Sequence, residues 1–200
     1  MTITALTTYR SKDHPNMLWL EVATQDGPVG LGETFYAAES VEAYIHTNLA
    51  PNVLGMSAID IEAVHYRARP YIGFVGASVE LRARSALDIA LWDAFGKAAN
   101  QPVSVLLGGR IRDKIPVYNT CAGYRYVRGP KVGATENFGI QAPTAADDYE
   151  DLHRFLNDPV GLAGSLLDMG ISSMKIWPFD FAAEASQGQF ISPTDLKKAL

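Results

Sequence analysis

The chain has 200 residues, of which 48% are hydrophobic, and a formal net charge of −5 at pH 7, which predicts a globular protein with one large or two small domains. The mixed charges argue against a nucleic-acid partner, which needs a basic face, and no apolar run is long enough to cross a membrane. Its single cysteine, Cys121, excludes an internal disulfide, and the first residues have no apolar signal-peptide core, so we expect a cytoplasmic protein.

The first third of the chain has the pattern of strands joined by short turns. Residues 3–10 and 17–24 are strand candidates, and the apolar residues of the second alternate onto one face. The turn signal Gln25-Asp26-Gly27 separates it from another extended segment, PVGLGETF (28–35). These segments predict an antiparallel meander.

Three helices are predicted next. Apolar residues at helical spacing begin at Val41, and Pro51 is expected to end that run. A second helix is expected from an N-cap at Ser57, with Asp60 three residues later. The strongest pattern covers 78–99, where charged pairs lie four residues apart and an apolar stripe runs along one side, formed by Leu87, Ala90, Leu91, Ala94, Phe95 and Ala98.

After residue 110 short apolar segments alternate with helical ones. In order, the sequence predicts a buried strand at 115–123, a polar loop at 124–146, a helix at 145–157, a helix from the Asp158-Pro159 cap to Gly170, a strand at 171–179 and a capped helix from Ile191. This order is typical of a parallel α/β array. Two parallel strands do not form a stable sheet alone, so we expect the chain to be truncated, with more sequence or a partner beside its second half.

Four stretches, in this order and spacing, resemble the mandelate racemase/muconate lactonizing enzyme-like branch of the enolase superfamily. They are WLEVATQDGPVGLGET (19–34), SALDIALWDAFGKAANQPVSVLLGG (85–109), IPVYNTCAG (115–123) and GISSMKIW (170–177), and the second is the most specific. The resemblance implies an α+β capping domain at 1–113, followed at 114–200 by the first two strand–helix units of a modified TIM (β/α) barrel. Barrel chemistry takes place at the carboxyl ends of the strands.

The resemblance also implies a reaction. Members of this family abstract a proton next to a carboxylate, and the enediolate that forms must be stabilised by a divalent metal and positioned donors. We expect a Mg²⁺-dependent lyase of carbohydrate catabolism that dehydrates an acid sugar, with a small-molecule carboxylate substrate and a homo-oligomeric assembly. The alternatives are a racemase or cycloisomerase of the same superfamily, or a catalytically inactive fragment or assembly module. The family's metal ligands lie on later strands, so we expect none within this chain.

Lys175 is the expected catalytic residue. The family often carries Lys-x-Lys at the end of the second barrel strand, and Lys175 falls at the first position, whereas the second is Trp177. An indole only donates hydrogen bonds, so Trp177 cannot be the base, and either Lys175 or a group on a later strand takes that role. The missing second lysine favours a dehydratase over a two-base racemase.

Other residues are candidates for substrate binding, each with a structural role as its alternative. His14, Tyr71 and Phe74 fall where the resemblance places the two specificity loops. Tyr124 and Arg125 follow the first strand of the second half, Trp177 lies at the end of the second strand and Asp180 follows it. An arginine suits carboxylate recognition because its guanidinium makes two parallel hydrogen bonds. Asp180 also suits a turn or a cap.

Overall fold

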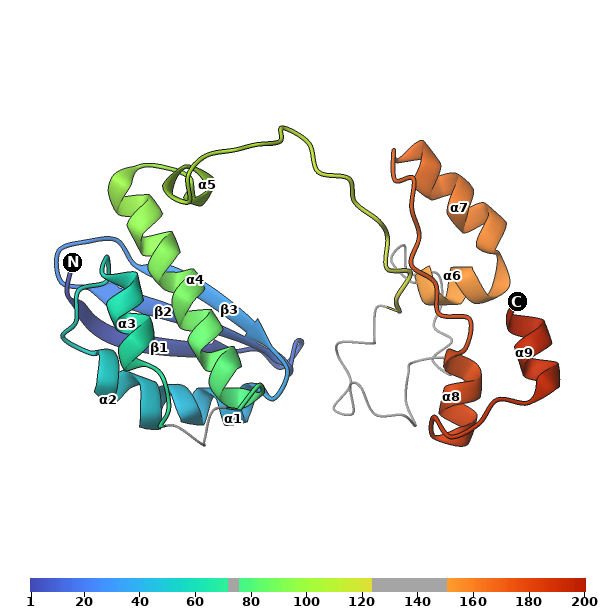
Figure 1. The fold of residues 1–200 in the computed structure, drawn as a ribbon, viewed down its shortest axis with the longest axis horizontal. Coiled ribbons are helices and arrows are strands. Elements are labelled where there is room, and N and C mark those ends of the chain that lie inside the picture. Colours follow the sequence, from blue (N-terminus) through green and yellow to red (C-terminus); the bar gives the residue numbers. More distant parts are fainter. Residues whose placement is uncertain (72–75, 124–150) are drawn as a thin grey trace. The chain divides into compact units, whose positions relative to one another are not determined.

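The computed structural model describes residues 1–71, 76–123 and 151–200 and divides into two compact units, Met1–Asp113 and Lys114–Leu200. The first unit contains β1 (Ile3–Arg10), β2 (Met17–Thr24), β3 (Gly30–Phe35), α1 (Ala38–Tyr44), a π-helical segment η1 (Ile45–Leu49), α2 (Ala50–Val53), α3 (Ile61–Arg67), α4 (Val79–Ala99) and α5 (Val103–Leu106). The second contains α6 (Asp151–Asn157), α7 (Pro159–Asp168), α8 (Asp180–Ser186) and α9 (Pro193–Ala199) (Figure 1).

The sheet of the first unit is an antiparallel meander in the order β1-β2-β3, as predicted. β2 is its central strand, and in the register Leu20 lies opposite Thr8 on one side and Gly32 on the other. Leu18, Leu20 and Val22 are fully buried on one face, because alternate residues of a strand point to the same side. This face of the sheet forms one side of the hydrophobic core.

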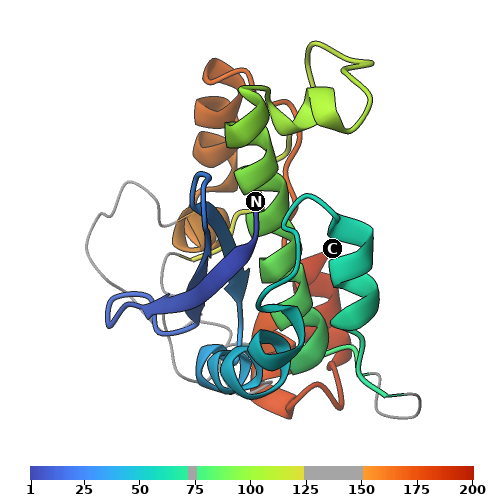
Figure 2. The same cartoon turned by 90° about the vertical axis from the view of Figure 1, so that its left-hand side faces the viewer.

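Helix α4 packs closely against β3 because two glycines of the strand face it. A Cβ added to Gly30 would collide with the carbonyl oxygen of Ala90, and one added to Gly32 with that of Ala86. Figure 2 shows α4 along one side of the sheet. The helix has the small residues Ala86 and Ala90 opposite these glycines, so the backbones of α4 and β3 approach each other closely.

One continuous core fills the space between the sheet and the helices. Its largest fully buried side chains include Leu20 in the sheet, Val41 and Ile45 in the first helical run, and Leu87 and Leu91 in α4. Burying one such side chain contributes roughly 1.5–3 kcal/mol. The predicted stripe of α4 is confirmed, except that Ala98 is exposed. Among the described residues, no helix combines the length and the apolar character that a membrane span needs.

The predicted helix end at Pro51 is wrong. The helical run widens into η1, where the amide N–H of Ala50 donates to the carbonyl of Ile45, and then continues as α2 to Val53. Pro51 therefore lies directly after the π-helical turn, and the helical run continues through it. The side-chain nitrogen of Asn52 donates to the backbone carbonyl of Asn48 at 2.7 Å, which satisfies one acceptor of the wide turn.

The predicted N-cap at Ser57 is also wrong. Ser57 forms an isolated antiparallel bridge with Thr2, which ties the loop to the start of the sheet. Helix α3 begins four residues later at Ile61, with Asp60 in the N-cap position and without a capping bond from its side chain. A contact with a distant strand has overridden the local capping signal.

The predicted buried strand at 115–123 is largely wrong. Ile115 is 75% exposed and Val117 60%, and among the described residues of this segment the pairing is a single parallel bridge between Asn119 and Met174. The predicted strand at 171–179 shares that one bridge. A parallel pair needs cover on both faces and further neighbouring strands, and neither segment has them within the described part of the second unit.

The helices of the second unit follow their local signals. The Asp158 side chain accepts a hydrogen bond from the N–H of Gly161 at 3.0 Å, and Ser192 caps α9 in the same way through the N–H of Asp195. Gly170, with φ of +81°, follows the end of α7. Helix α8 was not predicted. A small cluster of Cys121, Leu162 and Leu166 forms the core here.

Candidate functional site

Lys175 and Trp177 lie side by side at the end of the second bridged segment. The Lys175 ammonium is 4.2 Å from the centroid of the Trp177 ring. The indole N–H of Trp177 donates to the carbonyl oxygen of Thr120 at 2.7 Å. Lys175 is exposed and Trp177 is half-buried. An exposed ammonium on an aromatic face can bind an anion, which is the chemistry that a carboxylate substrate needs.

Asn119 connects the segments that carry this pair. Its backbone N–H donates to the carbonyl of Ser173 at 3.0 Å, and its carbonyl accepts from the N–H of Lys175 at 2.7 Å. Its side-chain nitrogen donates to Asp151 in α6 at 2.9 Å, while its side-chain oxygen accepts from the N–H of Cys121 at 2.6 Å. These hydrogen bonds hold Asn119 in place, and one of them ties the Lys175 backbone to it.

Asp180 is the first residue of α8, and the N-cap position before it belongs to Phe179, where no side chain makes a capping bond. Its N–H donates to the carbonyl of Trp177 at 3.4 Å, which connects the helix start to the aromatic residue. Burial, and then the negative charge of Glu184 one turn later, raise the pKa of Asp180 above its ordinary value. One oxygen of Glu184 is buried and has no hydrogen-bond partner among the described residues.

Glu184 and its helix are what sequence reasoning missed in this region. The segment FAAEAS contains three alanines and a glutamate, residues that favour helix, and this composition was the available signal. The carboxylates of Asp180 and Glu184 are four residues apart and lie on the same side of α8.

The first unit holds two of the predicted substrate-binding residues. His14 is half-buried in the loop between β1 and β2, where its carbonyl accepts from the N–H of Met17 at 3.0 Å. Tyr71 is 80% exposed at the edge of a polar pocket of about 360 Å³ that includes Tyr44, Asn48 and Glu80. Phe74, Tyr124 and Arg125 lie outside the described residues.

A strained turn next to the His14 loop was not predicted. Tyr36 and Ala37, directly after β3, both have positive φ, at 77° and 54°. The N–H of Tyr36 donates to the carbonyl of Asn16 at 2.8 Å, and the Arg82 guanidinium lies 5.3 Å from the Tyr36 ring centroid. Two successive non-glycine residues in this region are unfavourable unless surrounding contacts hold them. No glycine or asparagine marks the turn in the sequence.

No metal site is present among the described residues: nowhere do three histidine, cysteine, aspartate or glutamate side chains come together to hold an ion. The residues that the structure describes therefore do not offer a set of ligands for Mg²⁺. Cys121 is fully buried, and burial followed by the charge of Asp151 raises the pKa of its thiol. A thiol in that environment packs as a small apolar group and is not an activated nucleophile.

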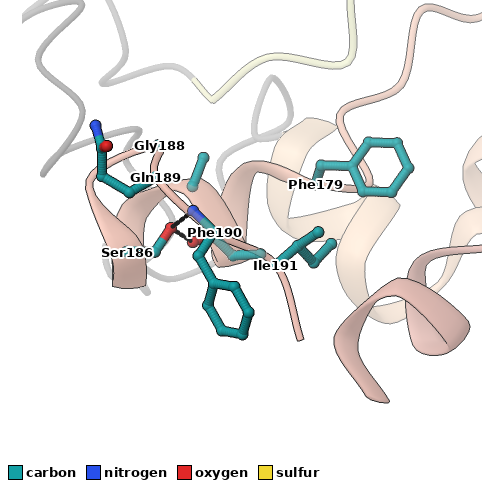
Figure 3. Close-up of a pocket in the computed structure, with 8 residues that line it drawn as sticks. Phe179, Ser186, Gly188, Gln189, Phe190 and Ile191 are labelled. Atoms are coloured by element: carbon teal, nitrogen blue, oxygen red, sulfur yellow. Dashed lines mark hydrogen bonds between the residues drawn. The ribbon is translucent and has the colours of Figure 1, made fainter. Parts of the chain in front are cut away.

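A shallow pocket of about 310 Å³ in the second unit contains none of the predicted site residues. Phe179, Phe190 and Ile191 contribute its apolar lining, together with Ala182, Ala183 and the chain around Gly188. Figure 3 shows the Ser186 hydroxyl engaged with its own backbone neighbours: it donates to Ala182 at 2.7 Å and accepts from the N–H of Phe190 at 3.2 Å. Its polar capacity is used within the helix end, so the pocket offers little chemistry.

Known proteins match both units. The family model of the mandelate racemase/muconate lactonizing enzyme N-terminal domain matches residues 3–108. A D-galactonate dehydratase of Klebsiella pneumoniae is 40% identical over 130 residues, which are 62% of this chain and 32% of the relative. The chain thus spans about a third of the length of the curated relatives that it matches.

Solved structures agree with this match. An enolase of the mandelate racemase subgroup from Agrobacterium tumefaciens is 42% identical, with a TM-score of 0.76 over 100% of this chain and 45% of that one. An enolase from Pantoea ananatis with bound D-gluconate and Mg is 31% identical, with a TM-score of 0.55 over 64% of this chain and 32% of that one. The predicted resemblance is confirmed, and so is the α+β capping fold of the first unit. This chain belongs to the mandelate racemase/muconate lactonizing enzyme family of the enolase superfamily.

Proposed function

We propose that the natural protein is an acid-sugar dehydratase, a lyase that acts on a sugar acid of the galactonate or gluconate type. The observation that carries this proposal is the 40% identity to a D-galactonate dehydratase over 130 residues. The Pantoea ananatis relative that holds D-gluconate supports the same substrate class. Trp177 in place of a second lysine supports a dehydratase over a two-base racemase, because racemisation needs a proton acceptor on each face of the substrate.

The proposed reaction removes water across two neighbouring carbons. A base takes the proton from the carbon next to the carboxylate, the hydroxyl on the following carbon leaves as water after receiving a proton, and the enol becomes a 2-keto-3-deoxy acid. Lys175 is the residue that we place in this chemistry, because it is an exposed cation at the end of a segment that Asn119 fixes. It would contact the substrate carboxylate, and His14, Tyr71, Trp177 and Asp180 stay proposed substrate contacts.

Mg²⁺ is part of the proposal through the relatives alone. The Pantoea ananatis enzyme was crystallised with Mg, whereas the described residues of this chain do not fit the ion. We therefore derive no step that uses it. We further propose a cytoplasmic homo-oligomer, and sedimentation of the natural protein would measure its mass in solution.

The decisive experiment incubates the natural protein with D-galactonate, D-gluconate and galactarate in the presence of Mg²⁺ and measures 2-keto-3-deoxy acids by their semicarbazones. We expect turnover of at least one acid and strongly reduced product formation at low substrate concentration in Lys175→Met, whose side chain has similar length and no charge. Far-UV circular dichroism checks that the variant is folded. Solvent deuterium entering the substrate without water loss would point instead to the racemase alternative.

A further inference from the structure

We propose that Trp177 is a positioning residue that holds Lys175 as a carboxylate-binding cation, so that another group abstracts the proton. The inference rests on the proposed function, in which Lys175 contacts the substrate carboxylate. Trp177, which stands where the family often has its second lysine, thereby has a role in positioning Lys175.

The geometry of the pair favours the cation. An aromatic face attracts an ammonium through its quadrupole and does not attract a neutral amine in this way. The Lys175 nitrogen lies 4.2 Å from the ring centroid, well inside the range in which this attraction acts. A lysine that acts as the base must be neutral before it takes a proton, so Lys175 would then lose this attraction to the Trp177 ring. A lysine that binds a carboxylate stays charged and retains it.

The ring is a fixed platform. The indole N–H donates to the carbonyl of Thr120 at 2.7 Å, and the backbone N–H of Lys175 donates to the neighbouring Asn119 at 2.7 Å. Both residues of the Lys-x-Trp motif are therefore tied to the same two-residue segment. Residues two apart in an extended chain point to the same side, which places the ammonium above the ring.

The charge of Lys175 is also available. The ion pairs of the described residues join Arg10 to Glu39 and Glu42, His65 to Asp88, and Lys97 to Asp93. None of them uses Lys175. An ammonium that is held on a ring, and that no carboxylate of the described residues neutralises, is suited to a carboxylate from a ligand.

The first test separates a cation from a base through Lys175→Arg, with Lys175→Met as the matched control. A guanidinium stacks on tryptophan and binds carboxylates, but it stays protonated and cannot act as a base. We expect Lys175→Arg in the natural protein to keep exchange of the substrate α-proton with deuterium to within about tenfold of wild type, whereas Lys175→Met raises KM by about a hundredfold. Loss of exchange in both variants would overturn the proposal.

The second test addresses the ring. Trp177→Phe keeps an aromatic face but loses the N–H that anchors it, and Trp177→Leu loses both. We expect Trp177→Leu to raise KM by about two- to fivefold with kcat unchanged, the size of an exposed cation–π contact, and Trp177→Phe to fall in between. An unchanged KM in Trp177→Leu would contradict a positioning role.

A spectroscopic test needs no activity. In the natural protein with labelled lysine, the ring current of Trp177 should shift the ε-methylene protons of Lys175 upfield, and this signal is assigned by its absence in Lys175→Arg. Trp177→Leu should return the signal to the position of a free lysine. If no sugar acid is turned over, the proposed function fails while this shift still upholds the placement of Lys175. An unshifted wild-type signal would overturn the placement, whatever the activity.

Discussion

The two units of this chain differ in how they close. In the first, the meander joins strands that follow one another in sequence, and α4 covers their apolar face, so a continuous core forms from local connections. In the second, the bridged segments around Asn119 and Met174 are far apart in sequence and pair at one position. Ile115, Val117 and Tyr118 are largely exposed there. Antiparallel hairpins can complete a sheet within a short stretch, whereas parallel strands depend on further neighbours.

The two units also differ in the interactions that stabilise them. Buried apolar side chains supply most of the stabilisation of a fold, and those of the first unit form a much larger cluster than Cys121, Leu162 and Leu166 of the second. The second unit relies more on caps and on polar contacts such as those of Asn119. Substitutions in the two units should therefore act through different mechanisms.

The largest effect is expected from Leu20→Ala, compared with Ile115→Ala in the second unit. Leu20 is fully buried in the central strand, so its truncation leaves a cavity and should lower the free energy of unfolding by about 3 kcal/mol or more. Ile115 is 75% exposed, and its truncation should change stability by less than about 0.5 kcal/mol. Urea unfolding followed by circular dichroism measures both. Equal losses would show that 115–123 is as deeply packed as the sheet.

A smaller effect is expected from the helix caps. Asp158 caps α7 through its side chain, whereas Asp60 occupies the N-cap position of α3 without such a bond. Asp158→Ala should lower the stability of α7 by about 1 kcal/mol, and Asp60→Ala that of α3 by a few tenths of that. Amide hydrogen exchange of each helix measures its local opening. A larger loss in Asp60→Ala would contradict the assignment of the two caps.

The caps also show what sequence reasoning could reach. The Asp158 cap, Gly170 and the capped start predicted from Ile191 act over three or four residues. The structure confirms each of them, with Ser192 as the cap of the last helix. Ser57 has a similar signal, but the bridge to Thr2 determines its conformation. Predictions from local patterns failed where a distant partner competes, and this also explains the exposed segment at 115–123.

The candidate site follows the same rule. The placement of Lys175 next to Trp177 follows from a motif of three residues, and the sequence was enough to single out both. The anchor of the indole on Thr120 spans 57 positions, and nothing in the pattern near Trp177 indicates it. The strained turn at Tyr36 and Ala37 depends likewise on Asn16 and Arg82, which are brought there by the fold.

The smallest expected effect is a pH dependence of the stability of α8 that comes from Asp180 and should be absent in Asp180→Asn. Burial and then Glu184 raise the pKa of Asp180 above its ordinary value of 3.8, so between the ordinary and the raised pKa the folded chain binds more protons than the unfolded chain. The contribution of Asp180 to stability is fully present below the ordinary pKa and is lost as the pH rises through the raised one. Asp180→Asn cannot titrate, so its stability relative to wild type should increase over that window.

Hydrogen exchange of the α8 amides between about pH 3 and about pH 7 measures this difference, because it reports the local opening of the helix that carries Asp180. Glu184→Gln removes the negative charge, which is the smaller cause of the raised pKa of Asp180. The pH range over which stability changes should therefore become narrower but persist, since Asp180 stays buried. Parallel pH profiles for wild type and Asp180→Asn would mean that the carboxylate is as well solvated in the folded chain as in the unfolded one. The start of α8 would then be as open to water as the segment at 115–118, and the contrast between a packed helix and an uncovered strand within the second unit would disappear.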